Sequence, residues 1–444
     1  MSSLSNTQAT AETAAAIHAI IATCEGDAPS CSVGVFRNGE TQFVTSGLAD
    51  IATGRVPDAE TLYYAGSVAK QFTALAVIQL VVAGEVELGD DIRKYIPEMP
   101  LRAPPITVDM LLHHTSGLPN NAKLLPLAGY RHAGETTRSE TLRMLIQYPQ
   151  SAFPPGTTFE YSNGGYLLLS ELVERVSGEP FAAYVGANIL GPLGMSRSCV
   201  LDGALPTDPN LARGYVPENG RFSLSEDIPK FGGAGAMMLT INDLAKYHHD
   251  IAVGHKIWSP DIRSLMTEPG RYGDGSPVVM PIPGHIFGYG SGLMHSRNWI
   301  LHGGNYAGFQ ALFAWHPETM LGLALLCGRG DVDSLRLAAS ILAAVNPDLP
   351  AIDAPRFSLA GPEGRFVSDT LRAVYDIVGE GEALRVTITP PGGLPPLIQT
   401  FMPKGEGVYE GVYVGGPLVL TFDPDRRGFR ISNETVVQRF RRAS

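Results

Sequence analysis

The chain has few cysteines and no excess of positive charge. Its 444 residues include four cysteines, none in a C-x-x-C pair or at the spacing of metal ligands. Scattered cysteines in a chain of this length predict reduced thiols. The formal net charge is −11, with acidic and basic residues mixed along the chain. This charge argues against nucleic acid or an anionic membrane as a partner.

Long hydrophobic runs and an export signal are also missing. No segment approaches the roughly 18 uncharged apolar residues of a membrane-spanning helix, since Lys70 interrupts the best candidate. The N-terminal segment lacks a basic region and reads as an amphipathic helix rather than a signal peptide. We therefore expect a cytoplasmic protein with no membrane partner.

Several catalytic signatures are absent as well. The chain contains no G-x-S-x-G, which removes the main reason to consider an α/β-hydrolase. It has no glycine-rich phosphate loop. His113-His114 and His248-His249 lie on predicted helices without H-E-x-x-H or another ligand pattern. We expect neither a metal site nor a cofactor.

Strand-like segments lie near both ends of residues 1–345, with a helical region between them. Early strands are expected between residues 31 and 46. The runs WILHGG, GFQALFAWH and MLGLALLCG predict late strands, followed by a helix over 333–345. The middle is mainly helical, with a capping box at Thr137-x-x-Glu140. The predicted fold is α/β of the α+β kind: an antiparallel sheet flanked by helices, with an all-helical subdomain.

The C-terminal part has a different pattern. Residues 346–360 are rich in proline and read as a linker. Residues 361–444 contain short alternating segments, among them ALRVTIT and PLVLTF, and almost no helical pattern. This predicts a small all-β, barrel-like domain after the first domain of residues 1–345.

A lysine inside an apolar segment is the first candidate for chemistry. Lys70 follows Ser67 by three residues, so helical geometry places both on one face. A buried lysine is costly unless a nearby group needs it. The start of a helix also offers free N–H groups that favour a developing oxyanion. The alternative is a capping serine and a lysine that reaches solvent.

Two further groups of residues add to this pair. Tyr161 and Asn163 precede a strong predicted helix. A tyrosine beside a cation can act as general base if its pKa falls, and an asparagine can hold a carbonyl; the alternative is a packing residue and an N-cap. His302, Gly303 and Gly304 end a strand, where glycines allow a substrate backbone to approach and the histidine offers a donor. A lone histidine is otherwise usually structural.

Together, Ser67-x-x-Lys70, Tyr161-x-Asn163 and His302-x-Gly304 resemble the motifs of the penicillin-recognising serine enzymes. That family includes class C-type β-lactamases, D,D-carboxypeptidases, D-aminopeptidases and related esterases. The resemblance covers roughly residues 28–345 and extends to LLHHTSGLP, FPPGTTFEYSNGGY and ILGPLGM. The C-terminal segment resembles the lipocalin-like β-modules of some D-aminopeptidase relatives.

The resemblance implies a covalent acyl-enzyme mechanism. Ser67 would attack an acyl carbonyl, Lys70 and Tyr161 would share the removal of its proton, and Tyr161 would pass a proton to the leaving group. Which of the two is the base stays open. The backbone N–H groups of Ser67 and Asn305 would form the oxyanion hole, and Asn163 would orient the substrate amide.

The third motif departs from the Lys-Thr-Gly of many family members, whose cation and hydroxyl bind the substrate's carboxylate. His302-Gly303-Gly304 keeps a donor that is mostly neutral at pH 7 and has no hydroxyl. His302 would lend polarity to the tyrosine or to the substrate. Esters, amides and amino-terminal D-residues therefore fit better than anionic β-lactams or a free D-alanyl carboxylate.

Three functions remain open from the sequence. Hydrolysis would make the protein a D-aminopeptidase, amidase or esterase that acts on a small amide, ester or short peptide. Transfer to an amine or alcohol would make it an acyltransferase of natural-product biosynthesis. A catalytically silent relative used for binding or assembly is the third, and the intact motifs argue against it. A homo-oligomer is left open, and loops 120–135 and 268–285 are expected to wall the pocket.

Overall fold

The structure is a computed structural model. It describes residues 2–37, 39–218, 220–225, 227–230, 232–282, 285–352, 363–368, 370–380, 383–391, 396–405, 407–413, 416–423, 427–433 and 436–443. The chain divides into two compact units, one of Met1–Met280 and Phe287–Asp353 and the other of Pro281–Ile286 and Ala354–Ser444. Most of the expected linker, residues 353–360, lies outside the described part.

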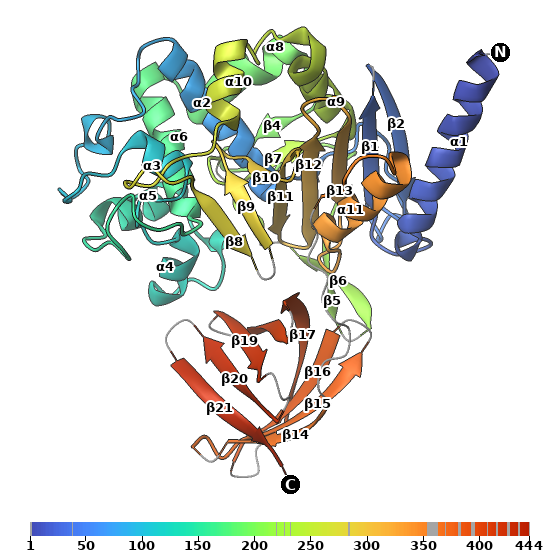
Figure 1. Ribbon diagram of the computed structural model, residues 1–444, viewed down its shortest axis with the longest axis vertical. Helices are drawn as coiled ribbons and strands as arrows, with labels where there is room; N and C mark the ends of the chain where they lie inside the picture. The colour runs from blue at the N-terminus through green and yellow to red at the C-terminus, as the bar shows by residue number, and fades with distance from the viewer. Residues whose placement is uncertain are drawn as a thin grey trace. The chain divides into compact units, whose positions relative to one another are not determined.

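The first unit contains the predicted sheet, built from both ends of this part of the chain (Figure 1). Its strand order is β2-β1-β13-β12-β11-β10-β9-β8, with antiparallel pairing from β2 through to β9. The strands are β1 (Cys31–Arg37), β2 (Glu40–Ser46), β8 (Val279–Ile282), β9 (His285–Tyr289), β10 (Met294–Ser296), β11 (Trp299–Tyr306), β12 (Phe309–Trp315) and β13 (Gly322–Cys327).

Both faces of the sheet are buried. On one side of the sheet, α1 (Ser2–Ile20) and α11 (Ser334–Val345) pack on each other and on strands of the sheet. On the other side, α9 (Ile241–His249) packs against β1 and β13. In β12, Phe313 and Trp315 belong to the core that contains α9, so period-two geometry turns Leu312 and Ala314 to the other face. All four are buried. Burial on both faces explains why β12 and β13 read as continuous apolar runs.

The helical region lies between the two groups of strands in the chain, as predicted. The capping box at Thr137 and Glu140 opens α5, and α6 ends at Gly178 in a left-handed conformation. No helix within the described ranges is both long and apolar enough to cross a membrane. The helices are α2 (Lys70–Val82), α3 (Val108–Leu112), α4 (Asn121–Leu127), α5 (Arg138–Gln147), α6 (Asn163–Ser177), α7 (Phe181–Val185), α8 (Gly191–Leu193) and α10 (Pro260–Thr267). Short strands join them: β3 (Tyr63–Tyr64), β4 (Cys199–Val200), β5 (Gly214–Glu218), β6 (Arg221–Ser225) and β7 (Met237–Leu239).

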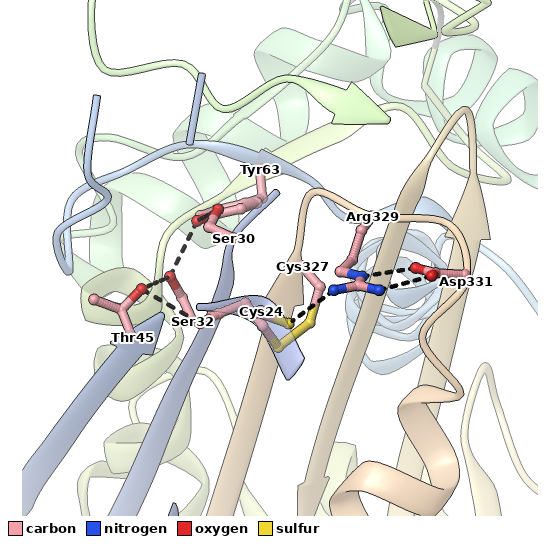
Figure 2. The surroundings of a disulfide bond; sticks show 9 residues. Cys24, Ser30, Ser32, Thr45, Tyr63, Cys327, Arg329 and Asp331 are labelled. Carbon is pink, nitrogen blue, oxygen red and sulfur yellow. Dashed lines mark hydrogen bonds and ion pairs between the residues drawn. A yellow bond between two sulfur atoms is a disulfide. The ribbon is translucent and has the colours of Figure 1, made fainter. Parts of the chain in front are cut away.

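A disulfide joins Cys31 to Cys327, contrary to the expectation of four reduced thiols (Figure 2). The two residues stand directly opposite each other on neighbouring strands β1 and β13, although 296 residues separate them in the chain. Cys24 and Cys199 form no disulfide. The prediction was wrong because spacing along the chain does not reveal which strands become neighbours. The cysteines therefore no longer argue for a reducing compartment.

The second unit contains a closed eight-stranded barrel, which confirms the predicted all-β domain. Its interior is packed with apolar side chains, many of them aromatic, and the rings of Phe429 and Phe440 stack with centres 4.8 Å apart. This interior is a core of the kind that fills small barrels. The strands are β14 (Gly364–Val367), β15 (Val374–Glu380), β16 (Ala383–Thr389), β17 (Leu397–Gly405), β18 (Val408–Tyr413), β19 (Gly416–Phe422), β20 (Gly428–Asn433) and β21 (Val436–Arg442).

Candidate active site

Ser67 lies where the chain passes from β3 into α2, at the edge of a cavity of about 250 Å³. It belongs to a short 3₁₀ helix, η2 (Gly66–Ala69), and the α-helix begins at Lys70. Gly66 has φ +52°, and a Cβ added there would meet the Asn305 amide nitrogen at 3.0 Å. Glycine suits this position because it adopts positive φ without strain and leaves room for the neighbouring strand. The backbone thus presents Ser67 to the cavity.

Lys70 is fully buried beside Ser67. Its Nζ lies 3.1 Å from Ser67 Oγ and donates to Asn163 Oδ1 and to the Ala234 carbonyl oxygen, both at 2.6 Å. The ring centre of Tyr161 is 4.8 Å from the same nitrogen. Burial lowers the pKa of Lys70 well below its usual value, and no charged group among the described residues opposes that effect.

These contacts suit a neutral amine. A neutral lysine has two N–H donors and one lone pair, and the two carbonyl oxygens of Asn163 and Ala234 each accept one N–H. The lone pair is then left for the hydroxyl of Ser67, the third neighbour of Nζ. The arrangement can therefore take the proton of Ser67, as general-base chemistry requires.

Tyr161 has its hydroxyl buried against this pair. Burial raises the pKa of Tyr161 above its usual value, and the Ser67 hydroxyl is close enough to offset part of the rise. Within the described residues the phenol forms no hydrogen bond of standard geometry. The sequence interpretation required a lowered pKa for a tyrosine base, and the burial of Tyr161 has the opposite effect. The side chain suits a proton donor better than a base.

The third motif is divided between the cavity and the interior. His302 is buried, its Nδ1 donates to the Gly303 carbonyl oxygen at 2.6 Å, and its Nε2 lies 3.3 Å from the Tyr289 hydroxyl. The structure therefore does not bring His302 into the cavity, and both ring nitrogens already have partners. Its ring lies next to Tyr161, with centres 6.2 Å apart. Of the two roles expected for His302, the one beside the tyrosine fits this placement.

The backbone of β11 passes against the nucleophile. A Cβ at Gly304 would lie 2.0 Å from the Ala65 carbonyl oxygen and 2.9 Å from the Ser67 amide nitrogen. Asn305 follows directly, lines the cavity, and has its own amide nitrogen next to Gly66. The N–H groups of Ser67 and Asn305 are thus brought to one side of the cavity, where donors of an oxyanion hole are needed. Asn163 also lines the cavity.

The cavity wall is mostly small and apolar. Loop 120–135 contributes to the wall, as predicted, whereas none of the described residues of 268–285 does. Residues between 229 and 236, which the sequence analysis did not single out, contribute to the wall instead. The lining residues are Tyr64, Gly66, Ser67, Asn121, Ala122, Leu125, Arg131, His132, Ala133, Asn163, Leu167, Pro229, Gly232, Ala234, Gly235, Ala236, Asn305 and Tyr306.

The cationic side chains of the wall already have acidic neighbours. Arg131 is largely exposed and forms an ion pair with Glu135. His132 Nε2 lies 3.2 Å from a carboxylate oxygen of Asp227. Among the described lining residues no buried cation faces the cavity, which suits a neutral ligand.

Two residues near the site were missed by sequence reasoning. His114 follows α3 with φ +57° rather than continuing the helix, and it is buried against Tyr161 with ring centres 4.3 Å apart. Tyr289 lies beside it in β9, with ring centres 4.9 Å apart. The signal for His114 was the LLHHTSGLP motif, but the histidines were tested there only for metal-ligand spacing. Nothing in the chain around Tyr289 marks it.

Comparison with known protein families and curated proteins finds relatives of this chain. Residues 9–346 match the family model described as Beta-lactamase. The chain is 38% identical over 188 residues to "Esterase EstB" of Burkholderia gladioli, covering 39% of this chain and 47% of that protein. It is 29% identical over 238 residues to "Unguisins hydrolase ungD" of Aspergillus violaceofuscus, covering 50% of this chain and 41% of that protein. The matched part spans less than half of either relative.

The fold is shared with a solved structure over nearly the whole chain. The octameric penicillin-binding protein homologue from Pyrococcus abyssi superposes with a TM-score of 0.68 at 23% identity. The match covers 97% of this chain and 99% of that one. Similarity at this level of identity establishes a common architecture, including the C-terminal part.

Proposed function

Because the chain belongs to the β-lactamase family, we propose that it is a serine hydrolase that cleaves amide or ester bonds through an acyl-enzyme on Ser67. One observation supports this most directly: the buried amine of Lys70 lies 3.1 Å from Ser67 Oγ at the edge of a cavity. A nucleophile and a base within hydrogen-bond reach, with the base held by further groups, are the parts that covalent catalysis requires. The two relatives named above are an esterase and a hydrolase.

The first half of the proposed reaction forms the acyl-enzyme. Ser67 Oγ bonds to the carbonyl carbon of the substrate while its proton passes to Lys70 Nζ. The carbonyl oxygen becomes an oxyanion that accepts from the N–H groups of Ser67 and Asn305. Collapse breaks the bond to the leaving nitrogen or oxygen, which takes a proton from the Tyr161 hydroxyl, and Lys70 returns a proton to Tyr161. Water then attacks the ester of Ser67 by the reverse proton path.

This assignment makes Lys70 the base and Tyr161 the acid. A lysine whose pKa is lowered by burial is neutral over a wider pH range, and a tyrosine whose pKa is raised stays protonated. Asn163 holds Lys70 through Oδ1, and its Nδ2, 3.4 Å from Asn120 Oδ1, faces the side of the cavity. We propose that Asn163 also orients the substrate through this amide.

The same assignment predicts the pH dependence of kcat/KM. Neutral Lys70 is the active form, so activity rises as pH increases through its pKa, which burial places well below the usual 10.5. We expect kcat/KM on a neutral ester to level off well below pH 10, with no loss of activity in the range where Tyr161 stays protonated. A rate that climbs about tenfold per pH unit up to about pH 9 and is still rising at pH 10 would indicate a lysine with an ordinary pKa near 10.4.

The cavity predicts poor turnover of anionic β-lactams. Gly303 supplies no hydroxyl, His302 is turned away, and Arg131 is paired with Glu135, so a substrate carboxylate finds no prepared partner. We expect kcat/KM for nitrocefin and benzylpenicillin below about 10⁵ M⁻¹s⁻¹, in the lower part of the usual 10⁴–10⁸ range. Neutral p-nitrophenyl esters, assayed in parallel, control for enzyme quality. Efficient penicillin hydrolysis would contradict the proposed preference.

The substrate and the acyl acceptor are tested together. We propose a small neutral amide, ester or short peptide as substrate, which a screen of p-nitrophenyl esters and of D- and L-aminoacyl amides would identify. Added amine or alcohol acceptors separate hydrolysis from acyl transfer, because transfer diverts the acyl group into a new amide or ester. Product analysis by mass spectrometry distinguishes the two.

Several features of the whole protein stay predictions. They are a catalytic domain of residues 1–345, a separate lipocalin-like domain of residues 361–444, a homo-oligomer and a cytoplasmic location. Light scattering measures the assembly. Rapid quenching of cells followed by alkylation of the denatured protein tests the location, because a reducing cytoplasm would leave Cys31 and Cys327 as thiols.

A further inference from the structure

A chain of hydrogen bonds connects the second motif to the third through two residues that the proposed mechanism does not use. The Ser162 N–H donates to His114 Nδ1 at 3.1 Å, and His114 Nε2 lies 3.0 Å from the Tyr289 hydroxyl. The same hydroxyl lies 3.3 Å from His302 Nε2, and His302 Nδ1 donates to the Gly303 carbonyl oxygen. We call this path the His114–Tyr289 clamp.

The direction of every bond in the clamp follows from its ends. A backbone N–H can only donate, so His114 Nδ1 accepts from Ser162 and its Nε2 carries the proton given to Tyr289. A backbone carbonyl can only accept, so His302 Nδ1 carries a proton and its Nε2 accepts from Tyr289. Within the clamp the tyrosine hydroxyl accepts one bond and donates one, and the Tyr166 hydroxyl is a further neighbour. All partners are satisfied with both histidines neutral.

Burial keeps the clamp in this uncharged form. His114, Tyr289 and His302 are 1%, 0% and 2% exposed. Burial, followed by the nearby Lys70, lowers the pKa of His302 to about 3 and that of His114 well below its usual value. Because each end is a backbone group, the path cannot deliver a proton to the reacting atoms. Its effect is mechanical: it fixes the distance between two segments of the chain.

The two segments carry the catalytic groups. Ser162 lies between Tyr161 and Asn163, and Gly303 lies two residues before Asn305. The clamp therefore joins the start of α6 to β11, which supplies one oxyanion donor. His114 also packs on the ring of Tyr161, with centres 4.3 Å apart. Its φ of +57° is uncommon for a residue other than glycine and is maintained by the surrounding structure.

We propose that His114 and Tyr289 are positioning residues, which hold Tyr161 and Asn163 in register with Ser67 and the oxyanion donors. This inference rests on the proposed function. A displacement of about 1 Å in reacting groups can cost about a hundredfold in rate. Neither residue lines the cavity, so the loss should fall on kcat and leave KM nearly unchanged.

The first test replaces Tyr289 by phenylalanine and uses Tyr63→Phe as a matched control. Tyr63 is 1% exposed, and its hydroxyl also has two partners, Ser30 at 2.7 Å and Ser32 at 3.0 Å. Each substitution removes a buried hydroxyl that has two hydrogen-bond partners, but only Tyr289→Phe interrupts the clamp. With both assayed well below their melting temperatures, Tyr289→Phe should lower kcat about 10- to 100-fold with KM within about twofold. Tyr63→Phe should keep both constants within about twofold of wild type.

A second pair of variants tests His114 directly. His114→Asn keeps a side-chain acceptor for the Ser162 N–H and tolerates positive φ, but it cannot reach Tyr289. His114→Ala loses both links. We expect the two variants to lower kcat by a similar factor, within about threefold of each other, because either substitution cuts the link to Tyr289. This pair decides the question if Tyr289→Phe does not fold.

The outcomes separate the two proposals. Wild-type protein that neither turns over a substrate nor labels with a fluorophosphonate probe would overturn the proposed function. Active wild type with equal kcat in Tyr289→Phe and Tyr63→Phe, or with a near-wild-type kcat in His114→Asn, would overturn only the clamp. A change confined to KM would also overturn it, because positioning of the catalytic groups acts on kcat.

Discussion

Replacing Ser67 by alanine is expected to abolish turnover of every ester or amide that the protein cleaves. The substitution removes the only atom proposed to bond to the acyl group, and the Lys70 amine 3.1 Å away then has no hydroxyl to deprotonate. Wild-type protein incubated with a fluorophosphonate probe should gain the mass of one adduct, located at residue 67 by peptide mapping. The alanine variant should gain none. A catalytically silent relative would show no adduct in either protein.

Ser170→Ala provides a matched control for this result. Ser170 is a fully buried serine on α6, and its hydroxyl donates to the Leu167 carbonyl oxygen at 2.7 Å. Its removal should leave labelling and turnover close to wild type. Near-normal turnover in Ser67→Ala would exclude the covalent mechanism.

Loss of the Lys70 amine is expected to reduce kcat by at least about a hundredfold, because positioned general bases contribute about 10²–10⁴-fold. The side chain is buried and its amine contacts three oxygen atoms, so Lys70→Ala also leaves a void. Lys70→Met controls for packing, since it restores an unbranched chain of similar length without the amine. Both variants should lose activity to a similar extent. Recovery of activity in Lys70→Met would show that packing, rather than the base, was lost.

Tyr161→Phe is expected to cause a loss of similar size that depends on the leaving group. An amine must be protonated to leave, whereas p-nitrophenolate leaves without a proton. If Tyr161 is the acid, its loss should reduce amide cleavage by about a hundredfold and p-nitrophenyl ester cleavage much less. Comparison of one acyl group carried as an amide and as a nitrophenyl ester measures the difference. Equal losses on both substrates would return Tyr161 to the role of base.

The sheet could be predicted from the sequence because its strands are marked locally. Buried on both faces, β12 and β13 are apolar runs of strand length, broken in β12 by Gln310, and α11 follows with a helical pattern. The pairing of β1 with β13 has no such local mark. Only the folded sheet places Cys31 opposite Cys327, which is why the disulfide was not foreseen.

The candidate site likewise contains residues that local sequence predicts and residues that it does not. Ser67 and Lys70 are three residues apart on one turn, so their contact follows from local geometry. The Ala234 carbonyl that completes the environment of Lys70 is a backbone group 164 residues further on. Because it is a backbone group, no side chain in the sequence marks its position. His114 and Tyr289 are likewise separated by 175 residues and meet only through packing. Sequence motifs identified the reacting groups, whereas the residues that support them depend on tertiary structure.

The sequence predicted only part of the cavity wall. Residues 120–135 were expected to form part of the wall, and they include Leu125 and Ala133 of the lining. Gly232, Ala234 and Gly235 also line the cavity, and they carry no chemical group that a motif could identify. Small residues there allow the backbone itself to contact Lys70, a role visible only in three dimensions.

The unequal space around the two glycines of the third motif bears on how this chain could change its substrate over evolutionary time. At Gly304 a side chain would collide with the Ala65 carbonyl oxygen at 2.0 Å, so the backbone that leads into the nucleophile forbids variation there. At Gly303 a Cβ would meet nothing closer than the Ala311 carbonyl oxygen at 3.8 Å, an ordinary contact. A hydroxyl-bearing residue at 303 is therefore sterically open to a single mutation. The hydroxyl that helps to bind a carboxylate is thus withheld by the choice of residue at one position, and the scaffold retains the room to acquire it.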